Sequence, residues 1–189
     1  VIGGGYGGLS TALELRRNST NVVVLEADLF GNGASSRNGG AVSGSNVGKG
    51  IAPNKVSPVE RALGKERKLQ LLAGGAASVA NLESIINREK IDCHYVRCGQ
   101  FIGAYTPAHF EAMSAKVKMF NSAGNSDVAL LKRQEQKREI ATDFYFGGMT
   151  LEDTGSLHPA MLNMGLLERC QKYGVILCAN TSVLSISQE

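Results

Sequence analysis

The chain has 189 residues, of which 43% are hydrophobic and 20% charged, and its formal net charge is +3. This mild positive charge forms no dense block, which argues against a nucleic-acid-binding protein and a polybasic membrane anchor. No apolar run reaches the ~18 residues of a membrane-spanning helix, and no signal-peptide pattern is visible, so a protein without a membrane span is expected.

The first elements follow directly from the pattern of the opening residues, VIGGGYGGLS. Residues 1–5 read as the end of a buried strand, and residues 7–17 have helical spacing. The run VVVLEA is β-branched and typical of a central parallel strand. This order predicts a βαβ unit in an α/β, doubly wound sheet. The buried side of the helix is expected to consist of Leu9, Ala12, Leu13 and Leu15.

The glycine-rich turn carries the chemistry of this unit. Gly3, Gly5 and Gly8 match G-x-G-x-x-G, in which the first glycine permits the turn, the second lets a pyrophosphate approach, and the third lets helix and strand pack. Glu26 ends the second strand, where a carboxylate accepts hydrogen bonds from a ribose and disfavours a 2′-phosphate, so NADP is not expected. The pattern predicts dinucleotide binding and leaves NAD and FAD open.

A second glycine-rich stretch, residues 27–50, has two interpretations. It is either a flexible linker or an ordered loop whose backbone packs against a large ligand. Within GNGASSRNGG, Ser35 and Ser36 offer hydroxyls, Arg37 offers a positive charge, and Gly39 and Gly40 let the backbone lie against a flat ring. An NAD-binding domain usually proceeds quickly into another helix at this point, so the long loop favours FAD.

A long helix is predicted next. In SPVE, Ser57 is expected at the N-cap, Pro58 at the first helical position and Glu60 in a capping box. The pattern extends to about Lys90 with a weak point at Gly74–Gly75. The stretch IDCHYVRCGQFIGAY predicts two strands that turn near Gly99.

The rest of the chain alternates helices and strands. Thr106 and Pro107 are expected to cap a helix to about residue 123, buried through Phe110, Met113, Val117 and Phe120. KRQEQKRE is interpreted as a short exposed helix and DFYFGGM as a strand. GSLHPAMLNMGLLERCQKYG predicts a loop and a helix ending at Gly174. VILCANTSVLSIS predicts two further short strands.

The four cysteines, Cys93, Cys98, Cys170 and Cys178, contain no CxxC pair. Cys93 and Cys98 flank His94 as conceivable metal ligands, but a fourth ligand at a suitable spacing is missing. Ordinary packed thiols, no metal and a reducing, cytoplasmic setting are therefore expected.

Three stretches resemble one flavoprotein superfamily, the D-amino-acid oxidase and glycine or sarcosine oxidase group. They are VIGGGYGGLSTALELRR…VVVLEADLFGNGASSRNGG, YFGGMTLEDTGSLHPA and NTSVLSI. Within the superfamily the chain is most similar to γ-glutamylputrescine oxidase-type enzymes. The resemblance extends over essentially the whole chain, yet this represents about the N-terminal half of a typical member. The sequence is therefore expected to be a fragment that is inactive alone.

The resemblance implies a Rossmann-like FAD-binding domain of the glutathione-reductase type with part of an inserted α+β substrate domain. Residues 1–91 would form the first part of the FAD-binding domain, residues 92–149 the partial substrate domain, and residues 150–189 the continued FAD-binding domain. The family's later glycine-rich motifs and most of its substrate-facing sheet do not occur in this sequence.

The resemblance also implies which residues hold FAD. The pyrophosphate would be cradled by Gly3, Gly5, Tyr6, Gly7 and Gly8. Glu26 would bind the adenosine ribose, and Val183, on the last strand, would contact adenine through its backbone. The second glycine-rich stretch would supply Ser35, Ser36 and Arg37 along the pyrophosphate and ribityl chain, and Asn38, Gly39 and Gly40 near the isoalloxazine.

The activity implied by the resemblance is oxidation of a C–N bond by hydride transfer to the flavin. The substrate would be a small amine or amino acid, and the electron acceptor oxygen or another molecule. No catalytic residue is predicted. His158, before a proline at a helix start, is better explained by a structural role, and Tyr105 and Tyr145 by packing. His109 is expected to be exposed, and His94 has no evident partner. Covalent flavin attachment within the second stretch is disfavoured, since it contains no His or Cys.

Three alternatives remain at this point. An NAD-dependent dehydrogenase uses the same glycine turn, although the long second stretch argues against it. A hydroxylase-type flavoprotein shares the fold but little of its later signature is visible. A non-catalytic FAD-binding subunit of a larger flavoenzyme is the alternative from a different functional class.

Overall fold

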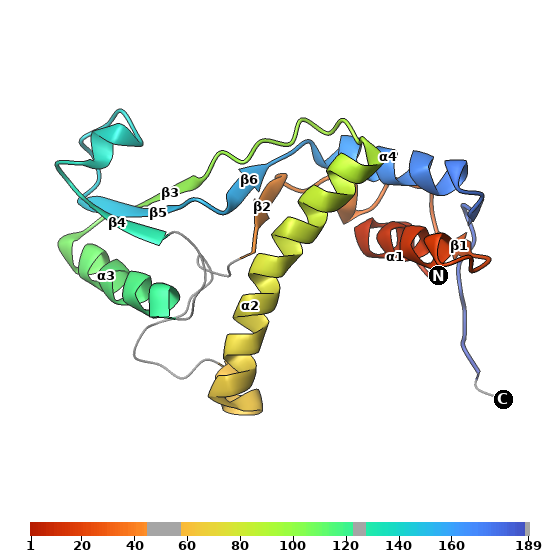
Figure 1. The fold of residues 1–189 in the computed structure, drawn as a ribbon, viewed down its shortest axis with the longest axis horizontal. Coiled ribbons are helices and arrows are strands. Elements are labelled where there is room, and N and C mark those ends of the chain that lie inside the picture. Colours follow the sequence, from red (N-terminus) through yellow and green to blue (C-terminus); the bar gives the residue numbers. More distant parts are fainter. Residues whose placement is uncertain (45–57, 123–127, 188–189) are drawn as a thin grey trace. The chain divides into compact units, whose positions relative to one another are not determined.

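The computed structural model describes residues 1–44, 58–122 and 128–187, within which some side chains of the two longest helices are not described. Figure 1 shows the succession of elements along the chain. The chain divides into two compact units. Unit 1 contains Val1–Ala41, Ser84–Tyr95 and Leu157–Glu189, and unit 2 contains Val42–Glu83 and Val96–Ser156.

Unit 1 is built on a parallel β-sheet, as the opening pattern predicts. Strand β1 (Val23–Leu25) pairs in parallel with β7 (Ile176–Cys178). Ile2 forms a parallel bridge to Leu25, so the opening residues lie on the other side of β1. The chain thus passes from the Ile2 bridge through a helix back into the same sheet, which is the predicted βαβ unit.

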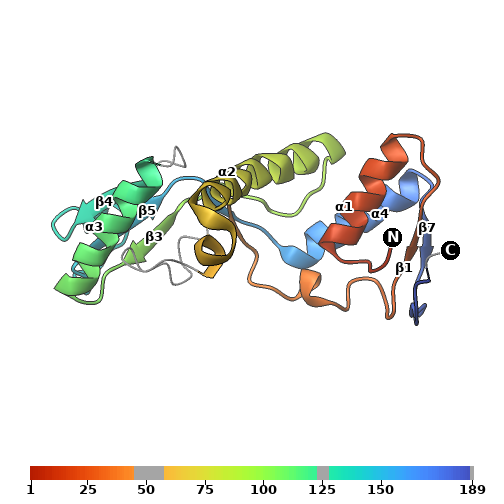
Figure 2. The ribbon, with the colours of Figure 1, turned by 90° about the horizontal axis from the view of Figure 1, so that it is seen from below.

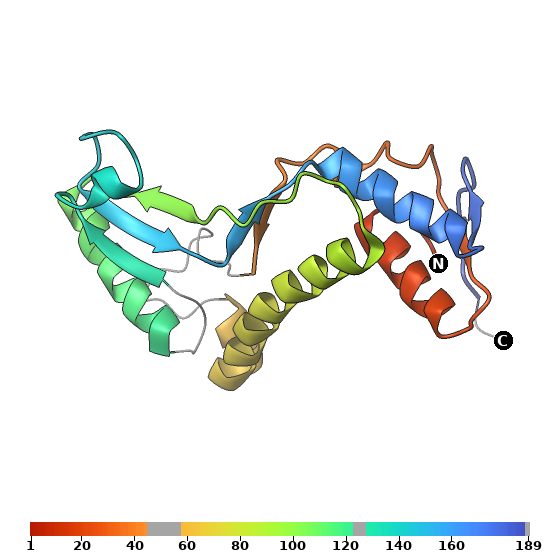
Figure 3. The ribbon, with the colours of Figure 1, turned by 45° about the horizontal axis from the view of Figure 1, so that its top comes forward.

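Two helices of unit 1, α1 (Tyr6–Arg17) and α4 (Pro159–Lys172), pack side by side (Figures 2 and 3). The inner side of α1 is formed by Leu9, Ala12 and Leu13, which are all buried. Leu15 is 39% exposed, so its predicted burial is wrong. Two positions beyond Leu13, it is rotated about 200° around the helix, away from the core.

Helix α4 begins and ends where local signals predict. His158 is the N-cap, and its Nδ1 accepts a hydrogen bond from the Met161 N–H at 3.3 Å. Pro159 follows in the first turn, where its missing N–H costs nothing. After the helix, Gly174 has φ +75°, the left-handed conformation that terminates many helices.

Unit 2 contains a three-stranded antiparallel sheet in the order β3-β5-β4. Its strands are β3 (Gln100–Gly103), β4 (Val128–Lys132) and β5 (Gly147–Leu151). Helix α3 (Pro107–Ser122) packs on one face of it. The short strands β2 (Ala41–Ser43) and β6 (Thr154–Ser156) form a separate pair.

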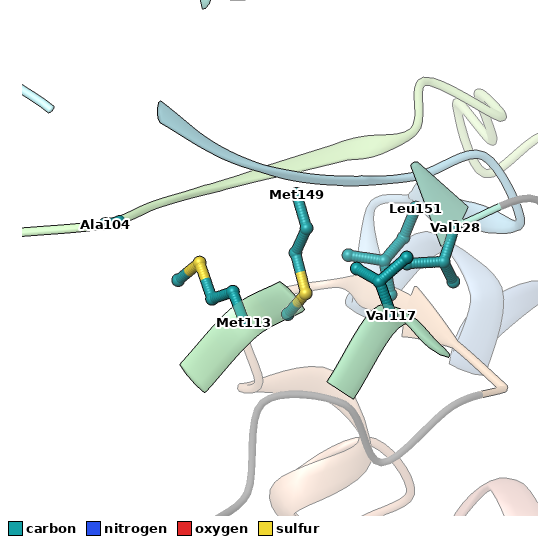
Figure 4. Packing of buried hydrophobic residues seen from close by; sticks show 6 residues of the cluster. All are labelled: Ala104, Met113, Val117, Val128, Met149 and Leu151. Atoms are coloured by element: carbon teal, nitrogen blue, oxygen red, sulfur yellow. The ribbon is translucent and has the colours of Figure 1, made fainter. Parts of the chain in front are cut away.

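The core of unit 2 lies between α3 and the sheet. Met113 and Val117 of the helix meet Met149 of the central strand (Figure 4). The other buried members of this cluster are Ala104, Val128 and Leu151, with Phe110 packed against them. The predicted buried positions Met113 and Val117 are therefore confirmed, and Phe110 is partly buried, whereas the side chain of Phe120 lies outside the described residues.

Helix α2 (Pro58–Glu89) begins at the predicted proline. Its interruption lies at Gly64, with φ +81° and ψ +166°, and not at Gly74–Gly75. Glycine occupies this left-handed region without steric cost, which explains why the helix breaks there. Ser57 and the side chain of Glu60 lie outside the described residues. None of the described helices is long and apolar enough to cross a membrane.

Two further predicted elements differ in the structure. The strand expected before Gly99 is reduced to one bridge, Val96 to Ser156. KRQEQKRE is not an exposed helix: its first residue ends β4, and Gln136 begins a single 3₁₀ turn, η2 (Gln136–Arg138). Gln136 is fully buried because its amide donates to the Thr142 carbonyl at 2.9 Å and accepts from the Gly147 N–H at 3.3 Å.

Candidate functional site

The glycine turn of unit 1 depends on a very close approach of backbone to backbone. Gly3 has φ +92°, and its N–H donates to the Leu25 carbonyl at 2.8 Å. A Cβ on Gly8 would collide with the carbonyl oxygen of Gly3. The first and third glycines of the motif are therefore required by the turn itself.

The second glycine-rich stretch meets the start of α1. Ser35 Oγ accepts a hydrogen bond from the Tyr6 N–H at 3.0 Å, and a Cβ on Gly5 would lie 2.8 Å from that oxygen. The hydroxyl satisfies one of the N–H groups that every helix leaves unpaired at its N-terminus. This hydrogen bond brings the glycine turn and the second glycine-rich stretch together.

The rest of the α1 N-terminus is open. Its first turn contains no acidic residue, and no described residue accepts from the N–H of Gly7 or Gly8. Gly7 is exposed, and the position of a Cβ on it has no atom within 4 Å. Unpaired N–H groups and the positive end of the helix dipole suit a phosphate, so this turn fits the pyrophosphate of a dinucleotide.

Glu26 holds the glycine turn from the end of β1. Its Oε2 accepts from the Gly4 N–H at 2.6 Å, and its Oε1 accepts from the Asp28 N–H at 3.1 Å. A Cβ on Gly4 would also collide with the ring of Phe30. Gly4 is the site residue that the sequence reasoning missed. The sequence contained a signal for it: three glycines stand in a row at positions 3–5, where the motif requires only the first and the third.

Residues 27–40, between β1 and β2, form an ordered loop, which we call the second loop. Asn38 donates to the Ser35 carbonyl at 2.9 Å and accepts from the Gly40 N–H at 2.9 Å. Ser36 Oγ donates to the Gly33 carbonyl at 3.0 Å. The linker interpretation is therefore wrong for this part, while residues 45–50 lie outside the described residues.

Gly40 permits a close backbone contact within the protein. It has φ +69°, and a Cβ on it would collide with the carbonyl oxygen of Leu157. The Leu157 N–H donates to the Gly40 carbonyl at 2.9 Å. Gly39, by contrast, has open space around it, and the Arg37 side chain beside it is exposed.

Tyr6 connects α1 to α4. Its hydroxyl donates to the Pro159 carbonyl at 2.9 Å. Burial raises the pKa of Tyr6, and a hydrogen bond with Asn38 partly offsets the shift. The phenol therefore remains a neutral donor that links the first turns of two helices and the second loop.

Val183 does not lie on a strand. Residues 179–187 form no strand, and Val183 is 37% exposed. The predicted second strand of VILCANTSVLSIS is therefore wrong for the described chain. The backbone there forms two hydrogen bonds, from the Asn180 N–H to the Asp28 carbonyl and from the Thr181 N–H to the Glu26 carbonyl. No described segment pairs with the residues that follow.

The histidines have structural surroundings. His158 caps α4, as described above, and His109 Nδ1 accepts from the Tyr105 N–H at 3.4 Å. His109 is half-buried, so its expected exposure is wrong. His94 is exposed and its ring lies 6.5 Å from that of His158. Tyr105 and Tyr145 belong to an aromatic cluster with ring centres 5.5 Å apart.

The cysteines are unpaired and differ in exposure. Cys93 and Cys170 are buried, and burial raises the pKa of Cys170 to about 11. Cys98 is exposed. No group of three or more His, Cys, Asp and Glu side chains that could hold a metal ion occurs in the described part of the chain.

A comparison with protein families decides between FAD and NAD as the cofactor. A family described as "FAD dependent oxidoreductase" matches residues 1–189. The chain belongs to this family. Its members use FAD, so FAD is the cofactor, and the NAD-dependent alternative is wrong. The predicted α/β Rossmann-like FAD-binding fold and the predicted family resemblance are confirmed.

Individual relatives are longer than this chain. This chain is 32% identical to the gamma-glutamylputrescine oxidoreductase of Escherichia coli (strain K12) over 165 residues, which is 87% of this chain and 37% of that protein. Among solved structures, it resembles glycine oxidase from Geobacillus kaustophilus, with a TM-score of 0.73, 21% identity, and coverage of 98% of this chain and 47% of that one.

A further solved structure contains the cofactor. L-alpha-glycerophosphate oxidase from Mycoplasma pneumoniae, with FAD bound, matches with a TM-score of 0.71 and 19% identity over 100% of this chain and 46% of that one. The chain therefore spans less than half the length of each of these relatives.

Proposed function

We propose that the protein carrying this chain oxidises a C–N bond of a small amine or amino acid. When bound, FAD would supply a two-electron acceptor for the hydride on the carbon beside the nitrogen, with oxygen or another molecule as the final electron acceptor. The similarity to gamma-glutamylputrescine oxidoreductase and to glycine oxidase supports this substrate class. The observation that carries the cofactor's placement is the open N-terminus of α1 behind the glycine turn.

The residues of the turn have the groups that a dinucleotide requires. Gly3, Gly5, Tyr6, Gly7 and Gly8 cradle the pyrophosphate at the positive end of α1. Ser35 Oγ already accepts from Tyr6, so its proton remains free to be donated to a phosphate oxygen. Each oxygen of Glu26 accepts one backbone N–H and retains a second lone pair for a ribose hydroxyl.

The second loop extends this site in the proposal. Ser36 and Arg37 lie along the pyrophosphate and ribityl chain, and the exposed guanidinium of Arg37 offsets phosphate charge. Asn38, Gly39 and Gly40 lie near the isoalloxazine, and Val183 contacts adenine through its backbone. Residues 92–149 supply the first part of a substrate domain, residues 1–91 and 150–189 belong to the FAD-binding domain, and the chain alone is inactive.

Two glycines offer a direct test of where the pyrophosphate lies. Gly7 in α1 and Gly74 in α2 are both helical, and a Cβ on either meets no atom within 4 Å. Either alanine is expected to keep or raise stability by up to about 1 kcal/mol. Only Gly7→Ala is expected to weaken FAD binding, by about tenfold, because its methyl group would occupy the phosphate's position.

The measurement is FAD titration of the apoprotein by flavin fluorescence, with thermal unfolding as the stability control. Equal FAD affinity in the Gly7→Ala and Gly74→Ala variants would contradict the proposed pyrophosphate position. The full-length protein is used for both variants, since the chain spans less than half of its relatives.

The substrate class is tested by anaerobic visible spectra of the full-length protein before and after addition of amines, amino acids and glycerol phosphate. Bleaching of the flavin bands by an amine or amino acid is the expected result. Bleaching by glycerol phosphate alone would favour C–O oxidation, the second candidate, which the likeness to L-alpha-glycerophosphate oxidase supports. Flavin bands that no donor bleaches would favour the non-catalytic FAD-binding subunit.

A further inference from the structure

Asn163 is a buried polar residue in the apolar side of α4. It is 1% exposed, and its neighbours on that side are Leu162, Leu166, Leu167 and Cys170. Neither Oδ1 nor Nδ2 has a hydrogen-bond partner among the described residues. Leaving a buried amide unpaired costs about 1–3 kcal/mol, and buried polar atoms in native proteins are normally satisfied by protein or ordered water.

The amide lies against the beginning of the second loop. Asn163 Oδ1 is 3.6 Å from the position that a Cβ on Gly31 would occupy. Gly31 has φ +90° and no side chain, so the backbone of the loop lies directly beside the amide. The carbonyl of Gly31 accepts from Ser36 Oγ, which means that the same residue shapes the turn leading to Ser35.

Helix α4 also packs directly on this part of the loop, against the 3₁₀ turn η1 (Ala34–Ser36). Any group that fixes Gly31 relative to α4 therefore also helps to fix Ser35, whose hydroxyl accepts from the N-terminus of α1. A leucine at position 163 would continue the apolar pattern of the helix. The asparagine found there therefore indicates a hydrogen-bonding role for its side chain.

We propose that Asn163 is a positioning residue that holds the second loop on α4 through an ordered water molecule. Such a water accepts from Nδ2, donates to Oδ1 and bonds a backbone group of the loop, which gives it the usual three or so hydrogen bonds. The consequence is a Ser35 hydroxyl held in place for the cofactor. This inference rests on the proposed role of the second loop in FAD binding.

The test uses the full-length protein with Asn163→Leu, which preserves side-chain size and removes both polar groups. Two quantities are measured: hydrogen–deuterium exchange of amides 31–40 in the FAD-free protein, and the FAD dissociation constant. Exchange is expected to accelerate and FAD binding to weaken, each about tenfold, the effect of about one lost hydrogen bond. Asn87→Leu, the same change at an exposed helical position of unit 1, is expected to alter neither by more than about twofold.

A second pair of variants keeps the proposal falsifiable if Asn163→Leu does not fold. Asn163→Ser and Asn163→Ala differ by one hydroxyl group. Serine is expected to keep FAD affinity within about threefold of the wild type, and alanine to lose about as much as leucine. A purely structural effect of side-chain size would move both variants equally, and equal values would overturn the proposal.

Unchanged exchange together with a raised melting temperature in Asn163→Leu would also overturn it, because the amide would then be an uncompensated buried group. If the wild type bound no FAD, the proposed function would fail. The exchange measurement on the FAD-free protein would still decide the role of Asn163, so the two failures are distinguishable.

Discussion

Alanine in place of Gly8 is expected to destabilise the protein by about 3 kcal/mol, the upper end of the cost of overpacking a close-packed position. The new Cβ would collide with the carbonyl oxygen of Gly3 and lie 3.0 Å from its carbonyl carbon. Backbone atoms cannot rotate away as a side chain can. The turn must therefore move, and the hydrogen bond from Gly3 to the Leu25 carbonyl is lost with it.

FAD affinity should fall in the same variant by roughly a hundredfold, since each 1.4 kcal/mol corresponds to a factor of ten. Chemical denaturation gives the free energy of unfolding, and flavin fluorescence gives the affinity. Gly74→Ala is the matched control, because its methyl group meets open space in a helix. Wild-type stability of Gly8→Ala would show that the close approach of helix and turn is not needed.

The second large effect concerns an ion pair at the other end of α1. Arg17 Nη2 donates to Glu89 Oε1, and the Glu89 side chain is only 2% exposed. Arg17→Met is expected to cost about 3 kcal/mol, because it leaves a buried carboxylate without its main partner. The guanidinium of Arg88 remains at 3.7 Å but is 48% exposed and compensates little.

The control for this prediction lies in the same group of charges. Arg88→Met removes the exposed arginine and is expected to cost less than about 1 kcal/mol, as is usual for surface pairs. Adding Glu89→Leu to Arg17→Met should restore most of the stability, since the unpaired charge is then removed. Denaturant unfolding measures all four proteins. A double variant no more stable than Arg17→Met would indicate that packing, rather than charge, explains the loss.

Elements whose signals lie within one turn could be predicted from the sequence. Pro159 and Gly174 bound α4 because proline and glycine act on their own backbone. The spacing of Phe110, Met113 and Val117 predicted the buried face of α3 for the same local reason. Leu15 shows where this local reasoning fails. It is apolar, but its position around the helix turns it away from the core.

Polar residues were harder to place, since their burial depends on partners that a local pattern does not contain. Gln136 stands in a highly charged stretch, which favours an exposed helix. Its burial depends on the Thr142 carbonyl and the Gly147 N–H, both beyond that stretch. A polar side chain is buried only where such partners are available, so composition alone predicted the wrong environment.

The sequence by itself determined the cofactor-binding turn, because the spacing of Gly3, Gly5 and Gly8 acts within a few residues of backbone. Only the tertiary structure decided what surrounds it. The Ser35 hydroxyl reaches the Tyr6 N–H across 29 positions, and Arg17 reaches Glu89 across 72. Contacts of that kind depend on how separate elements pack, and hydrogen bonds over such separations leave no periodic trace in the chain.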